Sequence, residues 1–246
     1  GETIEEILGY LGQAERELEM IENLDREIEL QSQEVGKLGR QALECARSLS
    51  AARRATAQQM EAAMAAELGS LAFSQSGIEV HFQEQNGGLD DLRASGLDRV
   101  EFFFAPNPGE PARPLAKVAS GGELSRLMLA LKCLLARKDM VETVIFDEVD
   151  AGIGGEAAEA VARKIRELAG HHQVICITHL PQIAARGTAH YLVEKSVRNG
   201  RTLSTVVQLS ETQRVDELAR MLAGASVTKQ TLDWAATLLE KGQTAG

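Results

Sequence analysis

The 246-residue sequence has no long apolar run and only three cysteines. A membrane-spanning helix needs roughly 20 apolar residues, and no stretch approaches that, so no such helix is expected. The first residues, Gly1 to Glu6, are acidic where a signal peptide is basic, which makes the cytoplasm the expected compartment. The cysteines and the five histidines are scattered without ligand spacing. We therefore expect free thiols, buried at Cys133 and Cys176, rather than disulfides or a metal cluster.

Proline and aromatic residues are scarce and unevenly placed. Residues 1–72 contain no proline and one aromatic residue, Tyr10, whereas all five prolines and the other eight aromatic residues follow. A domain boundary near residue 72 is therefore predicted. The net charge of −10 is also uneven, since residues 1–35 hold eleven acidic and two basic side chains. This balance argues against binding of nucleic acid by overall charge, although the nearly neutral residues 73–246 could carry a local basic face.

The first region shows a seven-residue repeat. Apolar or small side chains recur at Ile7, Ala14, Ile21, Ile28, Val35, Ala42 and Leu49, with a companion stripe at Ile4, Leu11 and Leu18. This pattern is typical of a coiled coil, and a helix over residues 1–72 would extend about 100 Å and need a partner helix. Gly36 and Gly39 suggest a possible break at 36–39. A solvated surface helix is the alternative interpretation.

After residue 72 the period changes to that of an α/β fold. Strands are predicted at residues 78–82, 100–104, 143–147 and 173–178, with a hairpin of 190–197 and 201–209 that turns at Asn199-Gly200. Helices are predicted at 123–136, 155–169, 214–222 and 228–241, and a loop at 106–114. Because continuous apolar strands alternate with helices, we expect a sheet covered on both faces.

A glycine pair stands immediately before the helix predicted from Glu123. The sequence Ala119-Ser120-Gly121-Gly122-Glu123 offers free backbone amides, close approach at the glycines and the positive end of a helix. An anion such as phosphate fits this arrangement. The same residues also suit an ordinary helix start with Ser120 as N-cap.

Two carboxylates follow the strand predicted at 143–147. Asp147 and Glu148 come at the carboxyl end of an apolar strand, the edge at which α/β sheets bind ligands. One carboxylate that binds a hard cation and one that acts as base toward water would suit phosphoryl transfer to water. A solvated Asp-Glu pair at the end of a strand is the alternative.

Two further features follow these carboxylates. The glycine-rich residues 150–155 are typical of a turn that approaches another backbone closely, and His179 ends the next strand just before Pro181. His179 could touch a phosphate oxygen or be structural. The sequence contains no Gly-x-x-x-x-Gly-Lys-Ser/Thr phosphate loop.

In this order the motifs resemble the C-terminal half of an ABC-type ATPase head. The matches are a signature loop at 119–123, a Walker B strand at 144–148, a D-loop aspartate at Asp150 and a switch histidine at His179. Residues 117–126, 145–153 and 177–182 are similar to the RecN family of bacterial SMC-like DNA repair proteins. The resemblance implies an ABC/SMC-type P-loop ATPase head, of which residues 73–246 form the C-terminal lobe, a mixed sheet flanked by helices. It also implies that residues 1–72 form the coiled-coil arm.

The resemblance further implies an ATPase with ATP and Mg²⁺ as cofactors, in which two heads sandwich two nucleotides. By this resemblance, the signature-loop residues Ser120, Gly121, Gly122 and Glu123 contact the γ-phosphate bound to the other head. Asp147 binds Mg²⁺ through water, and Glu148 is the catalytic base. His179 contacts the γ-phosphate, and Asp150 couples the two sites. This chain alone, without the Walker A half, is expected to be inactive.

The implied activity is recombinational repair of DNA double-strand breaks, in which ATP-driven head dimerisation and hydrolysis control DNA holding. The implied partners are single- or double-stranded DNA at break ends, a second copy of the chain and the N-terminal half of the protein, without a membrane, in the cytoplasm and at the nucleoid. Two alternatives remain open: the nucleotide-binding subunit of an ABC transporter, which would not carry so long a heptad arm, and a non-enzymatic coiled-coil scaffold.

Overall fold

The computed structural model describes residues 3–71, 73, 76–83, 87–107, 109–118, 120–198 and 201–244. The chain divides into two compact units, one of Gly1–Ala57 with Phe82–Val100 and the other of Gln58–His81 with Glu101–Gly246. The division differs from a single boundary at residue 72, because residues 82–100 group with the first part of the chain. Among the described residues, no helix has the length and apolar character to cross a membrane.

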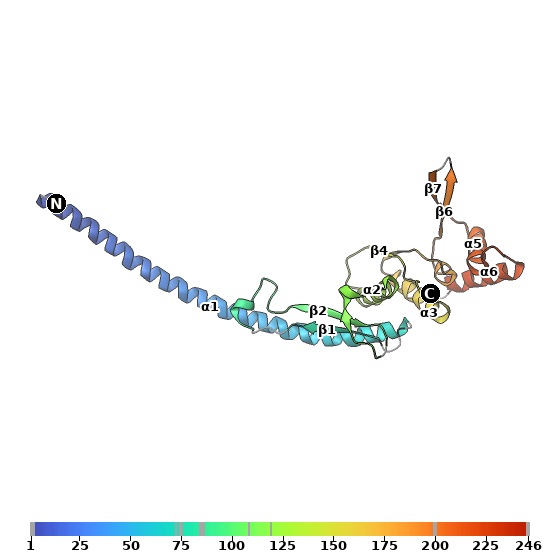
Figure 1. Ribbon diagram of the computed structural model, residues 1–246, viewed down its shortest axis with the longest axis horizontal. Coiled ribbons are helices and arrows are strands. Elements are labelled where there is room, and N and C mark those ends of the chain that lie inside the picture. Colours follow the sequence, from blue (N-terminus) through green and yellow to red (C-terminus); the bar gives the residue numbers. More distant parts are fainter. Residues whose placement is uncertain are drawn as a thin grey trace. The chain divides into compact units, whose positions relative to one another are not determined.

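The first element, α1 (Ile4–Ser70), is one helix of 67 residues (Figure 1). It continues through residues 36–39, so the break suggested by the two glycines is absent from the structure. A glycine costs only about 1 kcal/mol in a helix interior, which a long helix tolerates. At Gly39 the missing side chain also has a packing reason, since a Cβ there would lie 3.2 Å from Leu89 Cδ1 of the short 3-10 helix η1 (Leu89–Asp91).

The apolar stripe of α1 remains exposed over its first half. The side chains of Ile7, Ile21, Ile28 and Val35 are each more than half exposed. The helix is therefore formed as the seven-residue repeat predicts, and the partner helix that would cover this stripe stays a prediction.

Residues 95–98 are bonded to the middle of α1 within the first unit. Ser50 Oγ donates to Asp98 Oδ1 at 2.6 Å, and Arg53 Nη1 donates to Asp98 Oδ2 at 3.2 Å and to the Ser95 carbonyl at 2.9 Å. The Asp98 side chain is almost fully buried by these contacts. This polar cluster explains why residues 82–100 pack with α1.

A three-stranded sheet has the order β1 (Gly77–Phe82), β2 (Val100–Ala105), β3 (Arg113–Pro114). The prediction of a loop over 106–114 was wrong at its end, where Pro114 pairs with Phe103. A proline can occupy an edge strand because no neighbour on that side needs its missing N–H. The sheet is tied to α1 by Glu61, whose Oε1 accepts the Val80 N–H at 2.7 Å. A 3-10 helix, η2 (Leu115–Lys117), follows.

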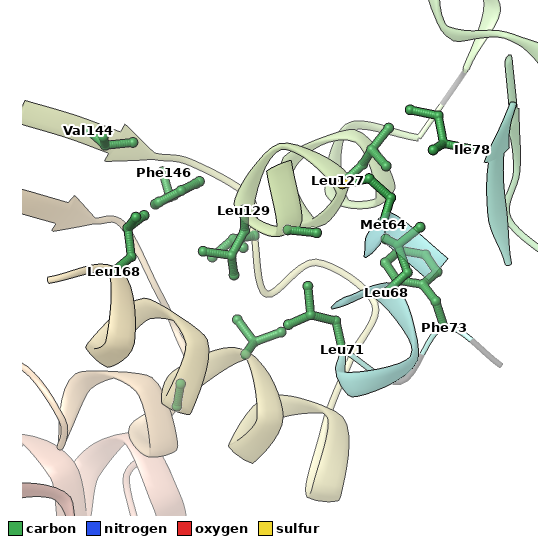
Figure 2. Packing of buried hydrophobic residues seen from close by; sticks show 14 of the residues in the cluster. Met64, Leu68, Leu71, Phe73, Ile78, Leu127, Leu129, Val144, Phe146 and Leu168 are labelled. Atoms are coloured by element: carbon green, nitrogen blue, oxygen red, sulfur yellow. The ribbon is translucent and has the colours of Figure 1, made fainter. Parts of the chain in front are cut away.

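The core of the second unit lies between α2 (Gly121–Leu135), α3 (Gly155–Leu168) and the strands β4 (Thr143–Phe146) and β5 (Gln173–Cys176). Figure 2 shows Leu127 and Leu129 of α2 between the apolar end of α1 and Val144 and Phe146 of β4. The two strands are parallel and in register from Thr143↔Gln173 to Phe146↔Cys176. All four elements were predicted from the sequence.

Only one face of this two-stranded sheet is covered. Val144 and Phe146 are buried, whereas Ile145 is 64% exposed and Ile175 is 46% exposed. The expectation of a sheet covered on both faces was therefore wrong for the described residues, since α2 and α3 cover one face and leave these isoleucines exposed.

The remaining elements are α4 (Pro181–Ala184), β6 (Tyr191–Arg198), β7 (Arg201–Gln208), α5 (Glu211–Ala223) and α6 (Lys229–Thr244). The predicted hairpin is confirmed by the antiparallel register from Tyr191↔Gln208 to Arg198↔Arg201, and its turn, Asn199-Gly200, lies outside the described residues. Pro181 starts α4, where its fixed φ suits the first turn. A second, smaller core joins α4, α5 and α6.

Candidate active site

The site is built around the start of α2. Ser120 is its N-cap, and Ser120 Oγ accepts the Glu123 N–H at 3.4 Å, so the capping role is present in the structure. The Ser120 side chain is nevertheless exposed. Ala119 of the signature loop lies outside the described residues. A cap and a phosphate contact use the same hydroxyl, so the geometry is compatible with both interpretations.

Glu148 lies against this helix start. A Cβ at Gly121 would overlap Glu148 Oε2, so the absence of a side chain there is what lets the carboxylate approach. Glu148 has φ +57, the one positive φ of a non-glycine residue among those described. A glutamate in this conformation is strained by about 1 kcal/mol or more, and such residues cluster at functional sites. The carboxylate also lies where the positive end of α2 favours negative charge.

The glycine-rich turn approaches α2 at Gly122. A Cβ on Gly122 would lie 2.9 Å from both Ala151 Cβ and the Ala151 carbonyl oxygen. The prediction that residues 150–155 approach another backbone closely is thus confirmed at Ala151. Gly122 is buried, so this contact has no free space into which a side chain could turn.

Two side chains of α2 fasten it to the same turn. Ser125 Oγ donates to the Asp147 carbonyl at 2.8 Å, and Arg126 Nη1 donates to the Ala151 carbonyl at 2.9 Å. Arg126 is only 8% exposed, and burial lowers the pKa of its guanidinium while Glu123 opposes the shift. Both residues lie within the RecN-like segment 117–126, but no role was predicted for them from the sequence. Two polar residues inside an apolar helix were the available signal.

Asp147 keeps an exposed carboxylate at the end of β4. Its Oδ1 accepts the Glu148 N–H at 2.9 Å, which fixes the side chain at the strand edge. Ser125 holds the Asp147 backbone, so the carboxylate is positioned by two independent hydrogen bonds. Both side chains remain exposed, so the geometry is compatible with a solvated Asp-Glu pair as well as with a cation ligand beside a base.

Asp150 is buried and connects the turn to the end of β5. Asp150 Oδ2 accepts the Thr178 hydroxyl at 2.6 Å and the His179 N–H at 2.8 Å, and lies 3.0 Å from His179 Nδ1. The His179 ring itself is 70% exposed. Asp150 therefore orients a histidine that faces outward. Thr178 was not singled out from the sequence, and no periodicity distinguishes it.

The thiol of Cys176, the last residue of β5, is poorly solvated. Burial raises the pKa of the Cys176 thiol to about 12, and the carboxylates of Asp150 and Asp147 add to the shift. Burial also raises the pKa of Cys133 to about 12. The three cysteines are free. Cys45 is exposed, and Cys133 and Cys176, which were predicted to be buried, are only partly buried.

The donor atoms suit a magnesium nucleotide better than a metal bound by protein alone. Among the described residues no cluster of three or more His, Cys, Asp or Glu side chains could hold a metal ion. Mg²⁺ is usually bound by one or two carboxylates together with phosphate oxygens and water. The exposed carboxylate of Asp147 fits such a group as one of its ligands.

Comparison with known proteins identifies the relatives of this chain. No protein-family model matches it. The chain is 39% identical over 242 residues to the DNA repair protein RecN of Halalkalibacterium halodurans, which covers 98% of the chain and 42% of that relative. It is 41% identical over 244 residues to RecN of Treponema pallidum, with 98% of the chain and 43% of the relative covered. The chain belongs to the RecN family.

The chain spans less than half the length of these RecN relatives. A solved structure, the Smc head domain with a coiled coil and joint from Pyrococcus yayanosii, matches at a TM-score of 0.48 and 22% identity over 68% of this chain and 29% of that one. The assignment rests on the RecN sequences. The order of elements, one long helix followed by strands and helices, agrees with the predicted helical arm and α/β lobe.

Proposed function

We propose that this chain is the arm and C-terminal lobe of an ATP-dependent DNA repair protein of the RecN type. In this proposal, ATP-driven dimerisation of two heads and ATP hydrolysis control how DNA is held during recombinational repair of double-strand breaks. The observation that carries the proposal is the convergence, within one unit, of the carboxylates after β4 and the histidine after β5, at the same end of two paired parallel strands. A carboxylate for the metal, a base for the water and a contact for the γ-phosphate are among the parts that phosphoryl transfer to water requires.

The residues of this chain divide the work as follows. Asp147 supplies a carboxylate for Mg²⁺, held at the strand edge by the Glu148 N–H. Glu148 takes the proton of the attacking water, because its carboxylate is exposed and adjacent to Asp147. His179 contacts the γ-phosphate and is oriented by Asp150. When bound, ATP would supply the electrophilic phosphorus, and Mg²⁺ would neutralise part of the negative charge on the phosphate oxygens.

The start of α2 contributes in trans. Ser120, Gly121, Gly122 and Glu123 offer a hydroxyl, backbone amides and a positive helix end to a γ-phosphate on the other head. Glu148 lies against its own Gly121 in the structure, so this side chain has to leave Gly121 before the glycine can close on a phosphate. The coupling of the two sites assigned to Asp150 then acts through its bonds to Thr178 and His179 rather than by direct reach, since its side chain is buried.

The proposed partners are DNA at break ends, a second copy of the head, the N-terminal half with its Walker A loop, and a partner helix for the exposed stripe of α1. The proposed location is the cytoplasm, at the nucleoid. Since the chain itself has no Walker A sequence, hydrolysis is proposed for the complete protein and not for this chain alone.

The experiment compares Glu148→Gln with the parental complete protein in a steady-state ATPase assay with DNA present and absent. Glutamine keeps the shape but cannot take a proton, so turnover should fall roughly a hundredfold or more while ATP binding persists. Glu156→Gln, on the exposed first turn of α3, is the matched control and should retain turnover. Parental turnover in Glu148→Gln would remove Glu148 as the base. Parental protein without any ATPase activity would instead favour the scaffold alternative.

A further inference from the structure

Arg126 is a buried cation for which the proposed mechanism has no use. It lies on the second turn of α2 and is 8% exposed. Among the described residues it makes no ion pair within 4.0 Å. A buried guanidinium is costly unless its N–H groups are bonded, so its partners indicate why it is there.

The first partner is the turn that carries the site. Arg126 Nη1 donates to the Ala151 carbonyl at 2.9 Å, directly after Asp150. Asp150 in turn accepts the His179 N–H at 2.8 Å. One guanidinium hydrogen bond therefore holds the residue next to the carboxylate that orients the histidine.

The second partner lies just beyond the end of α1. Arg126 Cζ is 5.2 Å from the centre of the Phe73 ring, within the range of a cation–π contact. Phe73 is buried, its N–H donates to the Leu68 carbonyl at 3.2 Å, and its ring packs edge-on against Phe104 at 5.8 Å. The Phe73 ring is thus held in place by its neighbours. The Arg126 guanidinium lies near this ring and is bonded to the Ala151 carbonyl, so it has little freedom to move.

From these contacts we infer that Arg126 is a positioning residue, which sets the Asp150-Ala151 turn, and through Asp150 the backbone of His179, against the end of α1. The expected effect of Arg126 on turnover rests on the proposed ATPase function, whereas its positioning of the Asp150-Ala151 turn does not. It does not place Arg126 in contact with nucleotide. The role requires a planar cation that stacks near the Phe73 ring and donates to the Ala151 carbonyl at the same time. The guanidinium of arginine can do both, whereas the ammonium of lysine keeps the charge but not the planar group with its several donors.

The test replaces Arg126 by methionine, which keeps an unbranched apolar stem and removes the donor. In the complete protein, amide hydrogen exchange is measured at His179, whose N–H is protected by Asp150, and along β5 at Gln173 and Ile177, whose N–H groups donate to the Glu142 and Phe146 carbonyls. Arg126→Met should speed exchange at His179 by about tenfold and leave the β5 amides unchanged. Arg126→Lys should give an intermediate rate. Arg163→Met, an exposed arginine of α3, is the control and should match the parent.

The catalytic readout is the split between kcat and KM. Arg126→Met should lower kcat about tenfold and change KM less than about twofold, because a displaced His179 misplaces a transition-state contact. Phe73→Leu should shift exchange in the same direction by a smaller factor.

Unchanged exchange at His179 in Arg126→Met would overturn the inference. Equal acceleration at His179 and throughout β5 would also overturn it, since that marks general loosening of the fold. If Arg126→Met does not fold, the same comparison in Arg126→Lys decides, and parental exchange there contradicts the inference. A complete protein without ATPase activity would defeat the proposed function, whereas the exchange result would still stand or fall alone.

Discussion

The contact between Gly122 and Ala151 allows a sharp comparison of two neighbouring glycines. Neither Gly121 nor Gly122 has a positive φ, so alanine can adopt either backbone, and each substitution gains about 0.5–1 kcal/mol of helix stability. The difference lies in what the new methyl group meets. At Gly122 it would meet Ala151, including its backbone carbonyl, at 2.9 Å, and Arg126 Nη1 at 3.2 Å. At Gly121 it would meet the end of the Glu148 side chain.

A backbone that must move costs more than a side chain that can rotate. Overpacking at Gly122 should cost about 1–3 kcal/mol, so Gly122→Ala should be destabilised by about 1–2 kcal/mol after the helix gain. Gly121→Ala should be neutral or more stable by up to about 1 kcal/mol, because the Glu148 carboxylate turns away. A difference of about 2 kcal/mol corresponds to a gap in Tm of about 4–8 °C for a chain of this size.

The assay is thermal and urea unfolding of both variants and the parent, followed by circular dichroism. Gly69→Ala supplies a matched control at the end of α1, where a Cβ would meet nothing within 4 Å. If Gly122→Ala unfolded at the same temperature as Gly121→Ala, the close approach of the turn to α2 would be wrong. The positions derived for Asp150 and Arg126 would then lose their basis.

Three further predictions follow from the same structure. The chain alone should hydrolyse ATP negligibly in a phosphate-release assay, because it has no Walker A sequence, and robust turnover abolished by Glu148→Gln would contradict this. Thiol reagents should modify Cys45 first and Cys133 and Cys176 far more slowly, because Cys45 is exposed while burial raises the other two pKa values to about 12; equal labelling rates would refute this. Burial and the nearby Arg214 lower the pKa of His190, with Glu217 opposing, so the folded state favours the neutral ring. The contribution of His190 to stability should therefore be complete above about pH 6.5 and decrease below it. Between about pH 7.5 and about pH 5.5, the Tm of His190→Gln should decrease less than that of the parent. Equal decreases in Tm would count against a role for His190.

The elements of the fold could be predicted because their patterns are local. The strand Thr143–Phe146 is a continuous apolar run, and the hairpin of β6 and β7 is two alternating segments around an Asn-Gly turn, so period and turn chemistry suffice. The loop prediction failed at Pro114 because pairing with Phe103 is a tertiary contact. The prediction that both faces of the sheet are covered failed at Ile145 and Ile175, which are exposed. An apolar run indicates a strand that can be buried, but it does not show whether helices of the same chain cover both of its faces.

The site divides in the same way. Asp147, Glu148 and His179 could be named because they end predicted strands, and the resemblance to ATPase motifs gave each a role. The bonds that hold them could not be named. Ser125, Arg126 and Thr178 act through contacts with residues 22 to 28 positions away in sequence, and no spacing rule encodes such contacts. The left-handed backbone of Glu148 was equally invisible, since glutamate has no preference for it.

Ser120 and Glu148 lie at the same edge of the unit, yet the proposal gives them opposite effects on the dimer. Arginine at Ser120 would remove a cap, at a cost of about 1 kcal/mol, and would also fill the γ-phosphate position of the neighbouring head. Glutamine at Glu148 would leave the interface intact and prevent its release by hydrolysis.

The most direct test is therefore ATP-dependent dimerisation of the complete protein, measured by light scattering after size exclusion for Ser120→Arg, Glu148→Gln and the parent. Glu148→Gln should accumulate as a dimer with ATP, and Ser120→Arg should bind ATP but stay monomeric. Normal ATP-dependent dimerisation of Ser120→Arg, with only a lowered Tm, would reduce Ser120 to a helix cap and contradict the two-head sandwich.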